Sequence, residues 1–261
     1  MFELTAFTVC FILILYFYGG AFVKLVIDTP GRIAQIAAQQ YVDLLQAKPN
    51  AVLGFATGST PLDLYAELTR LNQAGDISFR NVTTFNLDEY LGLDGTHDQS
   101  YRYFMNKALF EKIDIPLERT FLPAGDMIKN GDPASYDSAI EAAGGIDIQL
   151  LGIGHNGHIG FSEPGTPFGS LTHVADLTDS TIEANARFFA SKDEVPRQAT
   201  TMGIKSVMNA RSIIIIILGR AKAEIAKAAL KGPVTEAVPA SVLQLHPSVT
   251  WYVDHEAAAL L

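Results

Sequence analysis

The chain is poor in cysteine and in positive charge. It has a single cysteine, Cys10, among its 261 residues, and 19 basic side chains against 28 acidic ones. One cysteine excludes an internal disulfide framework and any zinc site with several cysteine ligands, and it is typical of a cytoplasmic protein. The formal net charge of −9 argues against a broad nucleic-acid surface and against attraction to anionic lipid. Internal repeats and low-complexity tracts are also lacking, and the length suits one large domain.

The N-terminal segment Ala6–Val23 differs from the rest because it is almost uninterrupted apolar sequence. It approaches the ~20 residues that cross a bilayer. Glu3 is the only charge before it, so the basic flank of a signal peptide is absent. The segment could be a membrane anchor, a swapped or packed apolar segment, or a spurious extension from an upstream start. The last is favoured, since Phe22–Asp28 already has the pattern of a first strand. We therefore expect residues 1–21 to be an extension and residues 22–261 to be a single domain.

From Phe22 onward, strand-like and helix-like segments alternate. The expected strands are 22–27, 51–56, 82–86, 146–153, 212–219 and 249–254, and the expected helices are 30–47, one beginning at Pro61, 99–113 and 221–232. Continuous apolar runs such as 212–217 are typical of parallel strands that are buried on both faces. This alternation predicts an α/β fold with a doubly wound, mostly parallel sheet covered on both sides. Ligands of such sheets bind beyond the carboxyl ends of the strands.

Two of the loops after strands could bind an anion. Thr57–Thr60 precedes a helix, so its hydroxyl groups, its glycine and the free N–H groups there could hold a phosphate. An ordinary helix cap made by Ser59 or Thr60 is the alternative. Arg220 and Lys222 stand at the start of a later helix, where cations oppose the helix dipole unless an anion is bound. A solvated lysine is equally consistent with that position.

Three further charged residues have two readings each. Asp88 and Glu89 follow an expected strand, where a carboxylate can serve as a general base or as a helix cap. Adjacent side chains point differently, so only one of the two should reach a site. Arg187 lies among apolar residues at helical spacing, and its guanidinium could point inward or remain at the surface.

The loop "GIGHNGHIGF", Gly152–Phe161, matches G-x-G-x-x-G after an expected strand. A dinucleotide-binding loop must open a helix, but prolines and glycines follow here, which argues against NAD. His155 and His158 would share a face only on a helix, so a metal site completed by Glu163 is also disfavoured. A histidine and a carboxylate beside a phosphate loop fit proton transfer better.

Taken together, these segments resemble the glucosamine-6-phosphate deaminases. The motifs that match, in the family's order, are "ATGSTPLDLYAEL", "FNLDEYLGL", "SYRYFMNKALF", "LGIGHNGHIGFSEPGT", "ANARFF", "VPRQATTMGI", "GRAKA" and "LQLHPSVTWYVD". The resemblance extends from about Phe22 to the C-terminus. It implies a three-layer α/β/α sandwich and conversion of glucosamine 6-phosphate to fructose 6-phosphate and ammonia, without a redox cofactor or a metal.

The same resemblance implies a role for each matching residue. Asp88 would move a proton between C2 and C1 through an enolamine-like intermediate, and His158 would handle the proton of the ring oxygen. Glu163 would orient and tune His158. Asn156 stands where some members carry aspartate; it could still hydrogen-bond to His158, but would give less electrostatic support to the charged imidazole. The positions matching the family's phosphate site are Gly58, Ser59, Thr60, Arg187 and Lys222.

Departures from the family pattern bear on assembly. The hexameric, allosterically activated branch carries an arginine–lysine pair where this chain has His173 and Ala175, and the C-terminal region is shorter here. We therefore expect a monomeric, non-allosteric, cytoplasmic enzyme that binds a small sugar phosphate, with membrane contact only through the N-terminal segment. The rival activities are that of 6-phosphogluconolactonase, disfavoured by "GFSEPGT" and "NLDEY", and a non-catalytic sugar-phosphate sensor, disfavoured because no DNA-binding segment is visible.

Overall fold

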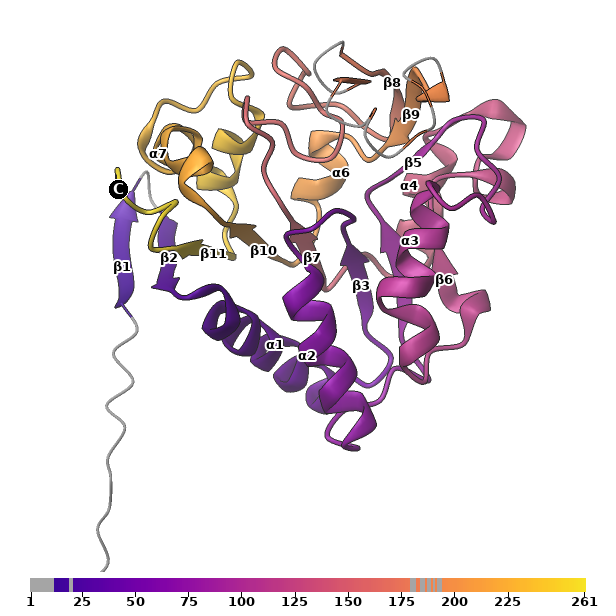
Figure 1. Ribbon diagram of the computed structural model, residues 1–261, viewed down its shortest axis with the longest axis horizontal. Helices are drawn as coiled ribbons and strands as arrows, with labels where there is room; N and C mark the ends of the chain where they lie inside the picture. The colour runs from indigo at the N-terminus through magenta and orange to yellow at the C-terminus, as the bar shows by residue number, and fades with distance from the viewer. Residues whose placement is uncertain are drawn as a thin grey trace, which may run out of the picture.

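The protein is built around a twisted eight-stranded sheet, which the computed structural model shows in Figure 1. The structure describes residues 12–18, 21–178, 182–183, 186, 189, 191 and 194–261. Across the sheet the strands are β1 (Ile12–Tyr18), β2 (Ala21–Asp28), β11 (Val249–Asp254), β10 (Ser212–Ile217), β7 (Ile148–Leu151), β3 (Val52–Phe55), β4 (Thr83–Asn86) and β6 (Thr120–Phe121). Neighbours are parallel except β1 and β2, which confirms the predicted mostly parallel sheet.

Helices cover both faces of this sheet, with α1 and α2 on one side and α6 and α7 on the other (Figure 1). The helices are α1 (Pro30–Ala47), α2 (Leu62–Gln73), α3 (Tyr101–Ala108), α4 (Ser135–Ala142), α6 (Ile204–Met208) and α7 (Ala223–Lys231). Phe55 contacts Tyr41 of α1 and Tyr65 of α2, with ring centroids 6.1 and 5.5 Å apart. Phe85 of β4 pairs with Gly54, the residue before Phe55, so its side chain points to the opposite face of the sheet. On that face the ring centroid of Phe85 lies 5.5 Å from that of Tyr136 in α4. The sheet is therefore the middle layer of three.

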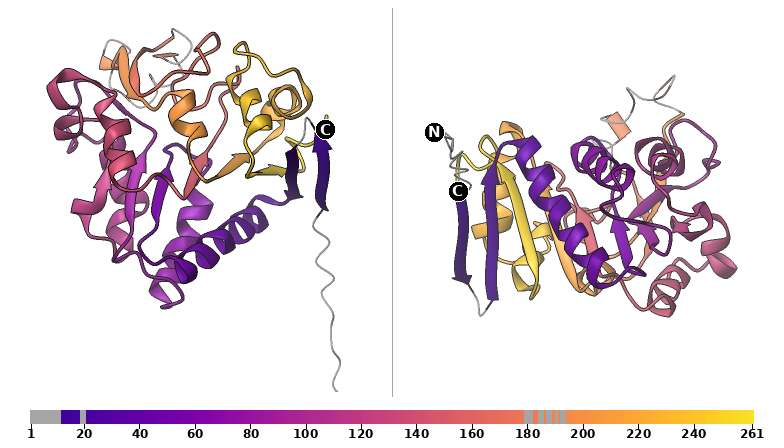
Figure 2. Two further views of the ribbon diagram at one scale, coloured as in Figure 1. Left: turned by 180° about the vertical axis from the view of Figure 1, so that it is seen from behind. Right: turned by 90° about the horizontal axis from the view of Figure 1, so that it is seen from below.

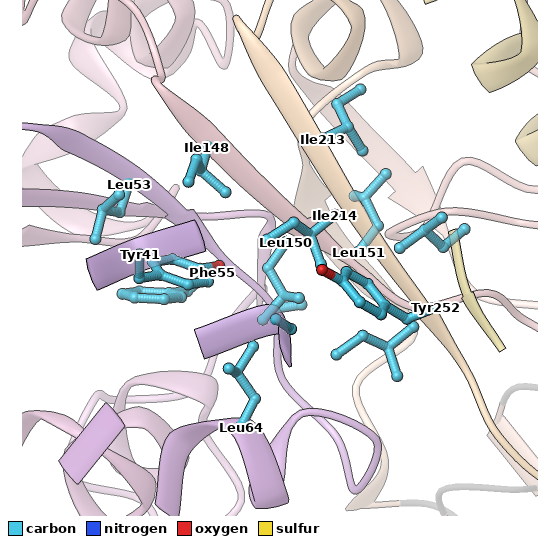
Figure 3. Close-up of a cluster of buried hydrophobic side chains, with 14 of the residues drawn as sticks. Tyr41, Leu53, Phe55, Leu64, Ile148, Leu150, Leu151, Ile213, Ile214 and Tyr252 are labelled. Atoms are coloured by element: carbon cyan, nitrogen blue, oxygen red, sulfur yellow. The ribbon is translucent and has the colours of Figure 1, made fainter. Parts of the chain in front are cut away.

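The core follows from the apolar strands that the sequence marks out (Figure 3). Ile213, Ile214 and Ile215 of β10 are completely buried, because this strand lies in the middle of the sheet with helices on both faces. The apolar side of α1 packs Ile33 and Tyr41 against the sheet. The predicted strands and the helix 30–47 are confirmed here, with boundaries that shift by a few residues at most.

A second, smaller sheet was not predicted. Its antiparallel strands are β5 (Asp88–Tyr90), β9 (Gln198–Thr201) and β8 (His173–Asp176). Strands of three or four residues with mixed polarity carry too little periodicity to be found in sequence. The chain enters this sheet at Leu87, whose N–H donates to Phe55 O at 3.1 Å and whose carbonyl accepts from Met202 N at 2.7 Å. Asp88 therefore opens a strand of the small sheet and does not lie in a loop.

The described part of the N-terminal segment is also a strand. β1 pairs antiparallel with β2 along its whole length and forms the outer edge of the large sheet (Figure 2). Residues 12–18 thus pack on the domain as an edge strand, and the expectation that residues 1–21 are an extension stays a prediction; residues 1–11, 19 and 20 lie outside the described part. No helix in the described ranges combines the length and hydropathy needed to cross a bilayer. The expected first strand after it is confirmed as β2.

Two predicted helices begin or end differently. The helix expected to begin at Pro61 begins at Leu62, with Pro61 at its N-cap. The helix expected over 99–113 ends at Ala108, and after Leu109 a 3-10 turn, η1 (Phe110–Lys112), continues the chain. Leu109 has φ −141° and ψ −57°, which breaks the helical path. β6, α4 and α6 are short elements that the sequence pattern did not reveal.

Candidate active site

A cavity of about 730 Å³ opens at the carboxyl ends of the central strands. It is lined by loops that follow β3, β4, β7 and β10, as expected for a doubly wound sheet. The sequence-predicted residues that line it are Gly58, Ser59, Thr60, Asp88, Asn156, His158 and Lys222. Glu163 stands behind the lining, next to His158. Arg187 lies outside the described residues, so its predicted phosphate role stays a prediction.

The loop Thr57–Thr60 joins β3 to α2 and forms one wall of the cavity. The N-cap residue of α2 is Pro61, and no side chain caps the helix with a hydrogen bond. Neither Ser59 nor Thr60 bonds its hydroxyl to a described residue, so the ordinary-cap reading is wrong. Gly58 has φ +97°, a conformation that glycine adopts without strain. The hydroxyl groups of Ser59 and Thr60 and the backbone N–H groups before α2 are therefore available to bind an anion.

Lys222 supplies a positive charge to the same cavity. It ends the 3-10 turn η6 (Arg220–Lys222) before α7, and its Nζ donates to Ile153 O at 2.8 Å. Burial lowers the pKa of Lys222, because a partly desolvated ammonium is less stable. The pKa of His155 is lowered too, chiefly by the charge of Lys222 and then by burial and His158. An anion placed here would relieve this local excess of positive charge.

The two adjacent carboxylates of β5 point to opposite sides of the strand. Asp88 lines the cavity, whereas Glu89 accepts hydrogen bonds from the backbone N–H groups of Tyr90, Tyr101 and Arg102 at 2.8–2.9 Å. The last two donors belong to the first turn of α3, so Glu89 caps that helix. Strand alternation therefore places the two carboxylates on opposite sides: Asp88 lines the cavity and Glu89 caps α3.

The environment of Asp88 makes it a much weaker acid than usual. Asp88 is 6% exposed, and burial, together with the nearby negative charge of Glu89, raises its pKa to about 8. A carboxyl group tuned toward neutral pH can both remove and return a proton.

His158 is held by the glycine-rich loop that follows β7. A Cβ on Gly154 would lie 2.3 Å from Cε1 and Nε2 of His158, so the imidazole packs directly on a backbone without a side chain. His158 Nδ1 lies 3.3 Å from Glu163 Oε1, close enough for an ion pair but without hydrogen-bond geometry. Asn156 donates to Glu163 Oε2 at 2.6 Å and accepts from the backbone N–H of His158 at 3.2 Å. Asn156 therefore orients the carboxylate and the loop, while Glu163 faces the ring.

The remaining alternatives for this loop find no structural support. Residues 152–172 contain turns and bends but no helix, so a pyrophosphate would have no helix N-terminus to rest on. In the described part of the chain, no three histidine, cysteine, aspartate or glutamate side chains are grouped as metal ligands.

Sequence reasoning missed the aromatic wall of the cavity. Tyr90, Tyr101, Phe161 and Phe189 all line it, and the rings of Tyr90 and Tyr101 lie 4.7 Å apart between centroids. Tyr90 shares a strand face with Asp88, since it is two residues further along β5. Reading "DEY" as a short strand would have placed Tyr90 beside Asp88, and nothing in the sequence indicated the other rings.

Residues 29–251 match the family model described as glucosamine-6-phosphate isomerases/6-phosphogluconolactonase. A protein of Clostridium perfringens named glucosamine-6-phosphate deaminase is 50% identical over 231 residues, which are 88% of this chain and 95% of that protein. One of Hahella chejuensis with the same name is 48% identical over 237 residues, 91% of each chain.

Comparison with solved structures agrees with these sequence similarities. A monomeric glucosamine-6-phosphate deaminase superposes with a TM-score of 0.86 at 45% identity, covering 91% of this chain and 99% of that one. The 6-phosphogluconolactonase from Trypanosoma brucei has a TM-score of 0.70 at 20% identity, over 90% of this chain and 98% of that one, a likeness of fold alone. These similarities confirm the resemblance read from the motifs and the predicted α/β fold.

Proposed function

Because the chain belongs to the family of glucosamine-6-phosphate isomerases and 6-phosphogluconolactonases, we propose that it converts glucosamine 6-phosphate and water to fructose 6-phosphate and ammonia. One observation carries the proposal: a single cavity combines a desolvated carboxyl group, a histidine–glutamate pair and an anion-binding corner. Aldose–ketose isomerisation of a sugar phosphate needs these three elements. The relatives that are about 50% identical carry the deaminase name, which favours this activity over lactone hydrolysis.

His158 opens the sugar ring in this proposal. A proton leaves the hydroxyl group on C1 and another reaches the ring oxygen as the C1–O5 bond breaks, giving the open-chain aldehyde. Glu163, whose Oε1 lies 3.3 Å from Nδ1, holds the imidazole in its orientation. Asn156 keeps that carboxylate in place through its amide group.

Asp88 then carries out the isomerisation. Its carboxylate removes the proton from C2 while the C1 carbonyl oxygen gains one, which gives an enolamine. The proton held by Asp88 returns to C1, leaving an iminium group at C2. Water adds to C2 and ammonia leaves, so the overall reaction is a hydrolysis coupled to an isomerisation. A pKa of about 8 suits a group that must give back the proton it takes.

The phosphate group binds to the loop after β3 and to Lys222 in this proposal, with Arg187 as a further ligand. The hydroxyl groups of Ser59 and Thr60 and the N–H groups near Gly58 support this placement, because they face the cavity without another described partner. Binding the phosphate fixes C1 and C2 relative to Asp88, which is how a remote group contributes to rate.

We further propose that the enzyme acts as a cytoplasmic monomer without allosteric activation and that residues 22–261 form its catalytic unit. Similarity to a monomeric deaminase at 45% identity supports the first point. His173 and Ala175, at the positions of the arginine–lysine pair of the activated branch, support the second.

Ammonia release from glucosamine 6-phosphate by the purified chain tests the activity, with hydrolysis of 6-phosphogluconolactone measured in parallel. We expect the first reaction and not the second, and we expect Asp88→Asn to abolish ammonia release while substrate still binds. Lactone hydrolysis without ammonia release would overturn the proposal. Full activity in Asp88→Asn would remove that residue from its role as the base.

A further inference from the structure

Thr201 lies at the junction between the strand of Asp88 and the loop of His158. We propose that Thr201 is a positioning residue that fixes the Asp88 carboxylate relative to this loop, an inference that rests on the proposed function for its catalytic meaning. Thr201 is completely buried and does not line the cavity, so it acts through the residues that do.

The first link runs across the small sheet. Asp88 of β5 is directly opposite Thr201 of β9 in the antiparallel ladder, which puts both side chains on the same face. The pairing is extended by the bond from Met202 N to Leu87 O at 2.7 Å. The position of Thr201 is therefore tied to that of Asp88 by the backbone on both sides of the pair.

The second link runs to the histidine loop. Thr201 Oγ1 accepts a hydrogen bond from Phe161 N at 3.0 Å, and both groups are buried. Phe161 is three residues after His158, in a segment without regular secondary structure. A side-chain oxygen thus takes the place of a strand partner for this part of the loop.

Gly160 shows how closely the three parts meet. A Cβ at this position would lie 2.8 Å from Thr201 Oγ1 and 3.5 Å from Asp88 Oδ2. Its φ of +59° is also one that side chains other than glycine rarely adopt. The loop backbone therefore lies against the threonine hydroxyl and the aspartate carboxylate at once, and it helps to keep water from Asp88.

The positioning role of Thr201 depends on its hydroxyl group, which accepts the hydrogen bond from Phe161 N. Valine has the same shape but leaves the buried Phe161 N–H without an acceptor, so the loop must shift to find water or another partner. A shift of about 1 Å in a catalytic group can lower a rate by roughly two orders of magnitude. Water admitted beside Asp88 would also lower the pKa of its carboxyl group, since burial is the main cause of the raised value.

Thr201→Val is the test variant, and Thr201→Ala serves the same purpose if the valine variant does not fold. We expect kcat to fall by about 10- to 100-fold, with KM changed less than about threefold because the phosphate loop is untouched. The acidic limb of the kcat/KM profile should move to lower pH. Thr201→Ser, which keeps the hydroxyl, should retain most of the wild-type rate.

Thr200→Val is the matched control. Thr200 is buried in the same strand, but it pairs with Glu89 and points to the other face, and its hydroxyl makes no hydrogen bond to a described residue. A kcat and a pH profile in Thr201→Val equal to those of Thr200→Val would overturn the positioning role. So would a serine variant as slow as the valine variant.

A second measurement separates this inference from the proposed function. The titration of Asp88 by carboxyl NMR and the hydrogen exchange of the Phe161 amide need no substrate. If the wild-type protein releases no ammonia, yet Thr201→Val lowers the Asp88 titration midpoint and speeds this exchange, the function is wrong and the positioning role stands. If wild type is active and neither quantity changes, the positioning role is wrong.

Discussion

Replacing Asp88 with asparagine should stabilise the protein while it removes turnover, because the wild-type carboxyl group is buried at a cost. Burial, with the charge of Glu89, raises its pKa from 3.8 to about 8. At about 1.4 kcal/mol per pKa unit, the ionised side chain costs the folded state ~6 kcal/mol relative to the neutral one. Asparagine is nearly isosteric and does not titrate, so it removes that cost.

The sign of the pH dependence follows from proton binding. Between pH 4 and pH 8 the folded protein keeps a proton on Asp88 that the unfolded chain has lost. The free energy of unfolding of wild type therefore falls as pH rises through this window, and levels off above the folded pKa. The free energy of unfolding of Asp88→Asn, relative to that of wild type, should therefore rise by ~4 kcal/mol between pH 5 and pH 8 and change little beyond pH 9.

Urea unfolding at five values between pH 5 and pH 9 measures this difference. Trp251 is the only tryptophan and is completely buried, so its fluorescence reports loss of the core. Asp43→Asn, at an exposed position on α1, is the matched control and should show no growing advantage. A constant difference between Asp88→Asn and wild type across this range would refute the reasoning, since it would mean that folding does not change the affinity of Asp88 for its proton.

Four other outcomes follow from the site. Glu89→Gln removes the negative charge beside Asp88, so the acidic limb of kcat/KM should move to lower pH; an unchanged or higher midpoint would contradict this. Lys222→Ala should raise KM about tenfold or more and weaken inhibition by inorganic phosphate, and an unaltered KM would exclude the phosphate role. His158→Gln should slow the closed-ring substrate more than an open-chain analogue, whereas equal slowing would argue against ring opening. The fragment 22–261 should retain deaminase activity, because β1 lies at the sheet edge and does not line the cavity; an inactive folded fragment would show otherwise.

The long elements of the fold could be predicted because their patterns are strong. The apolar run Ser212–Ile217 is typical of a strand buried on both faces, and the helical spacing over Pro30–Ala47 gives α1 to the residue. β5 and β9 could not be found, since three or four residues such as "DEY" are stabilised by pairing with a distant strand and not by their own pattern. Long-range pairing is information that a local pattern does not contain.

The candidate site, too, could be predicted only in part. Loops after strands could be named from the sequence, and the structure brings Gly58, Asp88, His158 and Lys222 to one cavity. Which of two adjacent carboxylates faces the cavity depends on the register of β5. The residue pattern left this open and only the family resemblance pointed to Asp88, which the structure places in the lining. Thr201 belongs to the segment "VPRQATTMGI", but no role could be predicted for it, because the contacts that give it one are with the distant residues Phe161 and Asp88.

The passage of the chain from one sheet to the other at Leu87 has a consequence for how such an enzyme can evolve. The loop Thr57–Thr60, His158 and Lys222 all follow strands of the large sheet, while Asp88 is carried by the small one. The position of Asp88 relative to the other lining residues therefore depends on how the two sheets pack against each other. Under the proposed function, substitutions within the small sheet can alter the environment of Asp88 without changing the loop that would hold the phosphate group.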